Sequence, residues 1–243
     1  MGRTIQAEMA ALGSKRLIAA VIMDVDGVIL DSPHERAWRE ALVGLAAPES
    51  LTTAIYQTHV AGKPRLAGAC AVLEQLDVPD LERHVEPYAD RKQKLLSDLI
   101  ADGSFSVFAD AVRFILAVRS YGLRLAAASA SKNANRMMAQ IRVPSGQNLL
   151  DLFDINVCGR DVRRGKPDPD LFLLAASELN LPPQSCAVVE DAPAGILAAK
   201  AAGMAALGVA RLDNQAALYS AGADRVVSTL DEMNMEALLR VLA

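Results

Sequence analysis

Acidic, hydroxyl and lysine side chains follow the short apolar runs of this chain. Four such motifs occur in chain order: Asp24-Val25-Asp26-Gly27, Ser129-Ala130-Ser131-Lys132-Asn133, Lys166-Pro167-Asp168 and Glu190-Asp191. If the runs are parallel strands, their carboxyl ends meet at one edge of a sheet, which is where such sheets bind ligands. Taken singly, each residue is typical of a turn or of a solvated surface. Together, the four motifs indicate one polar site.

The chemistry of this site follows from its charges. Four carboxylates belong to it: Asp24, Asp26, Glu190 and Asp191. Unpaired, they repel one another, and some of them have to take up protons. A Mg²⁺ ion removes the repulsion, because it prefers oxygen ligands and keeps waters that a phosphate can replace. The Lys166 ammonium and the Ser129 hydroxyl then supply positive charge and a donor to a bound phosphoryl group.

The elements that must position these residues form an alternating pattern. Six apolar runs, typical of strands buried on both faces of a parallel sheet, occupy 17–23, 123–128, 155–158, 186–189, 205–209 and 225–227. Apolar residues with helical spacing occur between or after them, at 109–121, 168–179, 193–202, 214–221 and 231–242. Strands that alternate with helices predict an α/β fold, with a parallel sheet core and helices on both faces.

One long segment interrupts the alternation. No strand pattern occurs from about residue 32 to 103, and four stretches there have helical spacing: 34–46, 51–59, 66–76 and 81–100. The simplest interpretation is an all-helical domain at 32–104, inserted into an α/β core formed by 17–31 plus 105–243, after an N-terminal extension at 1–16. The alternative is a few extra helices packed on one edge of the same core.

The composition excludes several classes of protein. The 243 residues are 52% hydrophobic and 22% charged, so the chain can bury enough apolar surface to fold, and disorder is excluded as its main state. A net charge of −4 argues against nucleic-acid and membrane partners. The three cysteines are far apart without metal-site spacing, which favours a reducing, cytoplasmic compartment. No interface pattern is visible, so a monomer is expected.

The motifs DVDG, ASAS, GKPDPD and EDAPAG, in this order, resemble the haloacid dehalogenase-like (HAD) superfamily of phosphotransferases. The resemblance covers residues 17–243, and the helical stretch falls where that family inserts its mobile cap. It implies a Rossmann-like core, a helical cap domain, a Mg²⁺ cofactor and a small phosphorylated substrate.

The resemblance also implies roles for the matched residues. Asp24 is the nucleophile that becomes an aspartyl-phosphate, and it binds Mg²⁺. Asp26 is the general acid and base, and its backbone carbonyl is a metal ligand. Ser129 and Lys166 hold the transferring phosphoryl group. Two further carboxylates complete the metal site, Glu190 and Asp191.

Within the family, ASASKN at 128–133, HERAW at 34–38 and GKPRL at 62–66 are most similar to the β-phosphoglucomutase branch. This similarity extends the expected phosphate- and substrate-binding set to Gly27, His34, Arg65, Lys92, Ala130, Ser131, Lys132 and Asn133. The stretch before His34 is about two residues shorter than in that branch. His34 is therefore either the hinge histidine of the family or a half-exposed residue at a helix start.

Three functions follow as alternatives. A sugar-phosphate mutase, assisted by a hexose 1,6-bisphosphate activator, is favoured because Arg65, Ser131, Lys132 and Asn133 offer donors to a second phosphate. A phosphatase of the same family, acting on a sugar phosphate or another small phosphomonoester, shares the core chemistry. A non-catalytic phospho-acceptor or binding module is the third alternative, and it belongs to a different class.

Overall fold

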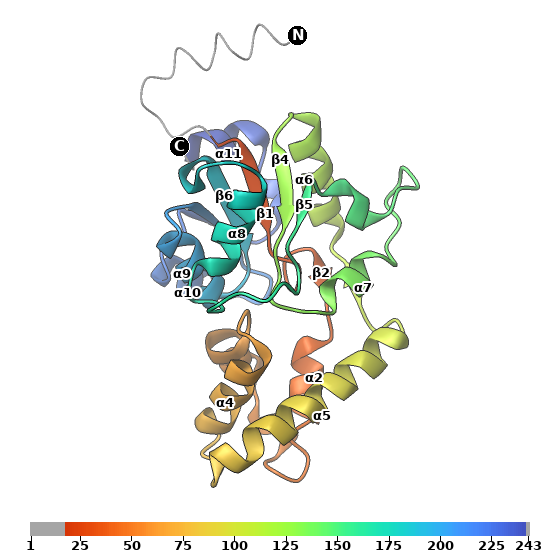
Figure 1. Ribbon diagram of the computed structural model, residues 1–243, viewed down its shortest axis with the longest axis vertical. Helices are drawn as coiled ribbons and strands as arrows, with labels where there is room; N and C mark the ends of the chain where they lie inside the picture. Colours follow the sequence, from red (N-terminus) through yellow and green to blue (C-terminus); the bar gives the residue numbers. More distant parts are fainter. Residues whose placement is uncertain (1–17, 242–243) are drawn as a thin grey trace, which may run out of the picture.

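The core of the protein is one six-stranded sheet. The computed structural model describes residues 18–241, so the N-terminal extension predicted at 1–16 lies outside the described residues. The strand order is β5-β4-β1-β6-β7-β8, and every neighbouring pair is parallel (Figure 1). The strands are β1 (Ala20–Met23), β4 (Arg124–Ala127), β5 (Ile155–Asn156), β6 (Cys186–Glu190), β7 (Ala205–Val209) and β8 (Arg225–Val227). Each predicted apolar run overlaps a strand, although residue 17 of the first run lies outside the described residues, and the predicted parallel sheet is confirmed.

Helices cover both faces of this sheet. Because successive side chains of a strand point to opposite faces, Val21 and Met23 of β1 enter one hydrophobic cluster, whereas Ala20 and Ile22 enter another. The first face is covered by α6 (Ala109–Ser120), α7 (Ala134–Met138) and α11 (Met235–Val241), and the second by α8 (Asp170–Glu178), α9 (Pro193–Ala201) and α10 (Gln215–Ser220). Short 3₁₀ turns complete the connections: η3 (Leu149–Leu152), η4 (Pro183–Ser185) and η5 (Leu230–Glu232). This burial explains why the central strands β1, β6 and β7 are almost entirely apolar, whereas β4 and the edge strands β5 and β8 include polar residues.

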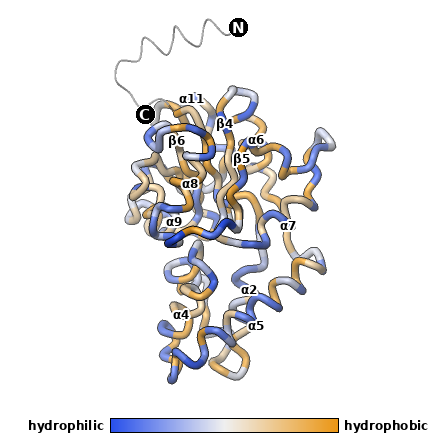
Figure 2. Tube along the Cα trace, viewed as in Figure 1, coloured by the Kyte–Doolittle hydropathy of each residue, from blue (hydrophilic) through white to orange (hydrophobic). Residues whose placement is uncertain are grey.

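The helices of the predicted insertion lie together on one side of the core (Figure 1). They are α2 (His34–Glu40), η1 (Pro48–Ser50), α3 (Thr53–Ile55), the π-helical turn η2 (Tyr56–Val60), α4 (Arg65–Gln75) and α5 (Leu81–Ala101). Trp38, Leu73 and Tyr88 belong to a hydrophobic cluster of their own there, and the Tyr88 hydroxyl donates to the Trp38 carbonyl at 2.8 Å. Along α5, polar and apolar stretches follow one another (Figure 2), and buried residues recur every three to four positions, at Tyr88, Lys92, Leu96 and Leu99. We call these helices the helical segment, and we propose that they form the separate domain predicted at 32–104.

A two-stranded ribbon joins the helical segment to the core. β2 (Leu30–Asp31) pairs antiparallel with β3 (Ser106–Val107), and Leu30 lies opposite Val107. Strands of two residues are too short to show alternation, so the sequence pattern does not predict them. Both chain connections pass through this ribbon, and the helical segment therefore leaves and re-enters the core at one place.

Three helical predictions need correction at their ends. The helix predicted at 231–242 starts only at Met235, after the 3₁₀ turn η5, and residue 242 lies outside the described residues. The helix predicted at 34–46 ends at Glu40, because residues 41–46 form turns that include Gly44 at a φ of +85°. The stretch predicted at 51–59 divides into a short α-helix and the π-helical turn. Within residues 18–241, no helix is both long and apolar enough to cross a membrane.

Candidate active site

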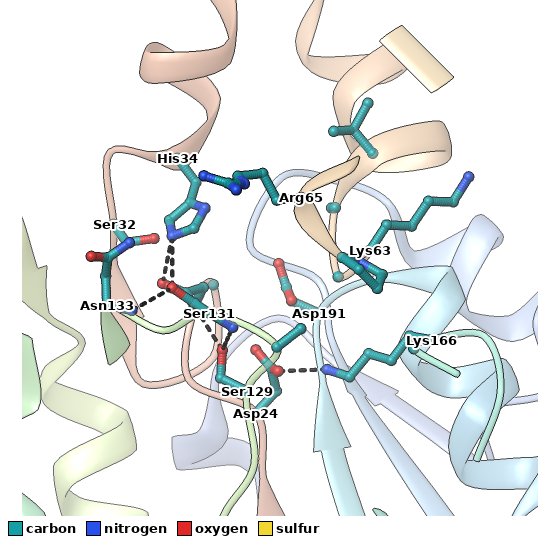
Figure 3. A pocket seen from close by; sticks show the side chains of 18 of the residues that line it. Asp24, Ser32, His34, Lys63, Arg65, Ser129, Ser131, Asn133, Lys166 and Asp191 are labelled. Atoms are coloured by element: carbon teal, nitrogen blue, oxygen red, sulfur yellow. Dashed lines mark hydrogen bonds and ion pairs between the residues drawn. The ribbon is translucent and has the colours of Figure 1, made fainter. Parts of the chain in front are cut away.

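A cavity of about 690 Å³ lies between the sheet edge and the helical segment. Residues of all four motifs that follow the strands meet at it, although they are up to 167 positions apart in the chain (Figure 3). The opposite wall comes from α2, α5 and the stretch 56–66. A Cβ atom at Gly165, next to Lys166, would lie 2.1 Å from Pro64 Cγ, so the two walls touch at this side of the cavity.

Lys166 lies at the bottom of the site, where it is 3% exposed. Its Nζ lies 2.5 Å from Asp24 Oδ1 and also donates to Glu190 Oε1. Burial alone would lower the pKa of Lys166, but the two carboxylates raise it above its usual value. The side chain is therefore an ammonium ion, held against the residue predicted to be the nucleophile.

Asp24, Glu190 and Asp191 form a buried cluster in which one ligand oxygen from each lies within 4.8 Å of the others. Burial raises the pKa of Asp24 to about 8; Lys166 opposes this shift, and the charge of Glu190 adds to it. The pKa of Asp191 is also well above its usual range, owing to burial and to Glu190. Three close carboxylate oxygens, with Asp24 and Asp191 resisting ionisation, fit a hard divalent cation such as Mg²⁺.

Two glycines make room for these carboxylates. A Cβ atom at Gly195 would lie 1.9 Å from Glu190 Oε1, and one at Gly27 would lie 2.0 Å from Asp191 Oδ2. Gly27 also has a φ of +89°, a conformation that other residues rarely adopt. Gly27 was predicted to bind phosphate or substrate, and that role stays a prediction; what the structure shows is that Gly27 packs against a carboxylate of the cluster.

Gly27→Ala is expected to lower both stability and turnover. Gly44→Ala is the matched control, because Gly44 has a φ of +85° and no atom within 4 Å of its Cβ position. Both variants carry the conformational cost of roughly 1 kcal/mol, but only Gly27→Ala displaces Asp191, which adds about 1–3 kcal/mol. Urea unfolding and steady-state assays measure the two effects. Equal stability and equal turnover in the two variants would show that Gly27 is not needed to make room for the Asp191 carboxylate.

Asp26 points away from this cluster. Its Oδ2 accepts a hydrogen bond from Ser129 Oγ at 3.0 Å, and His34 Nε2 lies 3.4 Å from its Oδ1. The Nδ1 of His34 lies 3.1 Å from Lys92 Nζ, and Ser131 Oγ lies 3.4 Å from Nε2. Burial, and then the charge of Lys92, lower the pKa of His34 to about 4, so the ring is neutral near pH 7. With Lys92 donating to Nδ1, the Nε2 proton faces Asp26 and Ser131.

His34 is the first residue of α2, as the second alternative expects, but its side chain is only 15% exposed and lies in the cavity near Asp26 and Ser131. Its role in the reaction stays a prediction. Lys92 lies beside His34, and its Nζ is 4.7 Å from the centroid of the Trp38 ring. Burial lowers the pKa of Lys92 to about 8. Asp26 was predicted to bind the metal ion through its backbone carbonyl, not through its side chain. The absence of its carboxylate from the acidic cluster of Asp24, Glu190 and Asp191 does not contradict that prediction.

The other residues expected to bind phosphate line the same cavity. The amide of Ser131 donates to Ser129 Oγ at 3.0 Å, and the amide of Asn133 donates to Ser131 Oγ at 3.2 Å, which shapes the loop that also contains Ala130. Lys132 is exposed and pairs with Asp161 at 3.1 Å. From the opposite wall, the half-exposed Arg65 lies 3.4 Å from Asp90 and lines the cavity.

Sequence reasoning missed several residues of the cavity. Tyr56 and Gln57 line it from the π-helical turn, which has no periodic signal in the sequence. Gln57 is 8% exposed, and its Oε1 has no hydrogen-bond partner among the described residues. An unpaired buried amide oxygen is costly, so this atom offers an acceptor to a ligand. Lys63 also lines the cavity and adds positive charge near its mouth.

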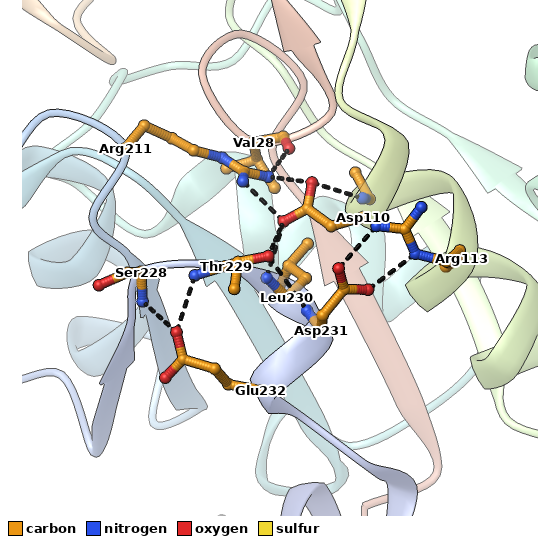
Figure 4. Close-up of polar contacts among 10 residues, drawn as sticks. Val28, Asp110, Arg113, Arg211, Ser228, Thr229, Leu230, Asp231 and Glu232 are labelled. Carbon is orange, nitrogen blue, oxygen red and sulfur yellow. Dashed lines mark hydrogen bonds and ion pairs between the residues drawn. The ribbon is translucent and has the colours of Figure 1, made fainter.

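Arg211 lies at the edge of the cavity, in the segment that follows β7, and forms a bidentate pair with Asp110. The distances are 2.6 Å from Nη1 to Oδ2 and 3.1 Å from Nη2 to Oδ1 (Figure 4). Asp110 Oδ2 also accepts from Thr229 Oγ1 at 2.7 Å and from the Leu230 amide at 2.8 Å. Burial would raise the pKa of Asp110, but these hydrogen bonds lower it to about 2.

The Asp110 carboxylate should make folding pH-dependent. The pKa of Asp110 is lower in the folded state than the 3.8 of the free side chain. The carboxylate therefore adds about 2 kcal/mol to the free energy of unfolding at pH values well above 3.8, and this stabilisation declines as the pH falls toward 2. The stability difference between wild type and Asp110→Asn is therefore expected to shrink by about 1 kcal/mol between pH 5 and pH 3. Urea unfolding at each pH measures it. A difference that stays constant with pH would refute the assignment.

Comparisons with known proteins agree with this geometry. The haloacid dehalogenase-like hydrolase family matches residues 18–203. β-Phosphoglucomutase of Bacillus subtilis (strain 168) is 30% identical over 236 residues, which cover 90% of this chain and 93% of that protein. A phosphorylated carbohydrates phosphatase of Thermotoga maritima is 30% identical, with coverage of 89% and 97%. The solved β-phosphoglucomutase of the archaeal Pyrococcus sp. strain ST 04 is 33% identical, with a TM-score of 0.71 and coverage of 91% and 97%. The chain is therefore an enzyme that belongs to the haloacid dehalogenase-like hydrolase family.

Proposed function

We propose that the protein is a Mg²⁺-dependent phosphotransferase that acts on small phosphorylated sugars through an aspartyl-phosphate on Asp24. The observation that carries this proposal is the convergence of Asp24, Asp26 and Lys166 in one cavity that is faced by cationic side chains of the helical segment. The names of the relatives, β-phosphoglucomutase and phosphorylated carbohydrates phosphatase, support the substrate class.

The first chemical step forms a bond between an Asp24 carboxylate oxygen and the phosphorus atom, and breaks the bond from phosphorus to the sugar oxygen. Asp26, entering as the protonated acid, gives its proton to the departing oxygen. Lys166 and the Ser129 hydroxyl hold the transferring group through hydrogen bonds to its oxygens. A Mg²⁺ ion, when bound by Asp24, Glu190, Asp191 and the Asp26 carbonyl, supplies neutralising charge to the phosphoryl oxygens.

The second step regenerates the enzyme. A hydroxyl oxygen of a sugar phosphate attacks the phosphorus atom of the aspartyl-phosphate, and the ionised Asp26 accepts the hydroxyl proton. The Asp24 carboxylate leaves. When the acceptor and donor hydroxyls belong to one sugar, the net reaction is a mutase; when the acceptor is water, it is a phosphatase.

Donors on both walls of the cavity favour the mutase. A bisphosphate intermediate has a second phosphate that must be held away from Asp24. Arg65, Ser131, Lys132 and Asn133 line the cavity and carry suitable donors, and Gln57 offers an acceptor to a ring hydroxyl. A phosphatase remains the second candidate, since the Thermotoga relative bears that name. A non-catalytic module is set aside because the chain is an enzyme.

Product analysis over a panel of sugar phosphates tests the proposal. With Mg²⁺ and a hexose 1,6-bisphosphate activator, we expect interconversion of sugar 1- and 6-phosphates and little free phosphate. Removal of the metal with EDTA should abolish turnover, and re-addition of Mg²⁺ should restore it. Phosphate release that does not depend on the activator, with no isomerisation, would identify a phosphatase. Full turnover in EDTA would overturn the proposed metal site.

A further inference from the structure

The turn that carries Asp26 is held from outside by Arg211. Within the turn, the Ile29 and Leu30 amides both donate to the Val25 carbonyl at 2.9 Å, and the Gly27 amide donates to the Leu30 carbonyl at 2.8 Å. The Val28 carbonyl accepts a hydrogen bond from Arg211 Nη2 at 3.1 Å (Figure 4). Val28 is only two residues from Asp26, so this contact limits where the Asp26 backbone can lie.

Arg211 is itself fixed by two other contacts. Asp110, at the start of α6, binds it in the bidentate geometry described above. The Phe108 ring lies 4.1 Å from the guanidinium carbon, measured to the ring centroid. The Phe108 amide also donates to the Ile29 carbonyl at 2.9 Å. A single buried guanidinium, 12% exposed, therefore joins the segment after β7 to both connections of the helical segment.

We propose that Arg211 is a positioning residue that holds the Asp26 carboxylate where it can protonate the departing oxygen. Arg211 acts through the Val28 carbonyl and does not itself exchange a proton. This inference rests on the proposed function, in which Asp26 is the general acid and base. Guanidinium geometry suits the task, because Arg211 bonds two carboxylate oxygens and a carbonyl at once, whereas a lysine ammonium is a point donor.

Two kinds of substrate can show whether Arg211 positions Asp26 for proton transfer or only stabilises the fold. A sugar alkoxide departs only if it is protonated, whereas p-nitrophenolate departs without a proton. In Arg211→Met, we expect kcat for the sugar phosphate to fall by about 10²-fold with KM nearly unchanged. The pre-steady-state burst of p-nitrophenolate from p-nitrophenyl phosphate should keep its wild-type rate, because that step needs Asp24 but no acid.

Two further variants complete the experiment. Arg211→Lys should recover part of the lost kcat, since it can keep one of the contacts. Arg113→Met is the matched control. Arg113 lies on α6, one turn from Asp110, and forms a bidentate pair with Asp231 at 2.6 and 2.8 Å, but it has no hydrogen bond to the Asp26 turn. It should leave both rates unchanged.

The outcomes are distinct. A selective loss on the sugar phosphate, with the burst retained, supports positioning. Equal losses on both substrates, a loss of thermal stability with kcat retained, or the same kinetic loss in Arg113→Met would overturn it. If Arg211→Met fails to fold, Arg211→Lys is measured on the same two substrates. The loss of kcat on the sugar phosphate, compared with the loss of burst rate on p-nitrophenyl phosphate, then decides. Wild-type protein that turns over neither substrate would instead refute the proposed function itself.

Discussion

Asp24→Asn is expected to lower turnover by at least about 10⁴-fold, because an amide oxygen cannot serve as the nucleophile that accepts the phosphoryl group. Folding should be retained. The amide still offers an oxygen to Lys166 Nζ, which lies 2.5 Å from Asp24 Oδ1 in the wild type and keeps its contact with Glu190. Steady-state product formation and thermal unfolding measure the two expectations.

Asp98→Asn is the matched control for this variant. It makes the same chemical change at an exposed carboxylate that pairs with Lys94 at 2.9 Å, and it should keep wild-type turnover. Acid quenching during turnover provides a direct test: the wild-type peptide that contains Asp24 should carry phosphate, and the Asp24→Asn peptide should not. Appreciable turnover of Asp24→Asn, or phosphate on another residue, would show that Asp24 is not the nucleophile.

Lys166→Met should have the second largest effect, on both activity and stability. The ammonium contacts two buried carboxylates, and its removal leaves them without a counter-charge. Removing one partner of a buried ion pair costs about 3–5 kcal/mol. Turnover should fall by about 10²–10³-fold, because a donor to the transferring phosphoryl group is also lost. Urea unfolding in EDTA and steady-state kinetics in Mg²⁺ measure these effects.

The stability loss has a matched control and a rescue. Lys200→Met removes a lysine that pairs with Asp224 at 2.7 and 2.8 Å but is one-third exposed, so it should cost less than about 1 kcal/mol. Mg²⁺ should stabilise Lys166→Met more than it stabilises the wild type, since a cation would replace the missing counter-charge. Equal stability of the two lysine variants would show that Lys166 is not the main counter-ion of the acidic cluster.

The sheet was predictable because its strands are buried on both faces. All residues of β6, Cys186–Glu190, are buried, so both faces of the strand must be apolar. The exception is the last residue, Glu190, which lies at the polar edge of the sheet. The family followed from four motifs placed at such edges. The ribbon of β2 and β3, by contrast, pairs residues that are 75 and 77 positions apart in the chain, and no local periodicity encodes such a contact.

The site was predictable in its core and less so at the opposite wall. Asp24, Lys166 and Glu190 follow strands whose order the fold dictates, so their meeting could be foreseen, although their roles stay predictions. The place of His34 depends on how α2 packs beside Lys92, and the sequence left two alternatives. Gln57 and Arg211 carry no motif at all. Their importance arises from unpaired or shared hydrogen bonds that only the folded chain reveals.

The paired ribbon of β2 and β3 also bears on how such a chain could have arisen. Because Leu30 lies opposite Val107, the two ends of the intervening 76 residues are already adjacent in the core. Closing a loop between adjacent ends costs an entropy that grows only slowly with loop length. The core can thus accept intervening segments of very different size with little penalty. Evolution could therefore exchange the opposite wall of the cavity, which we propose selects the substrate, while leaving the carboxylates and Lys166 at the sheet edge untouched.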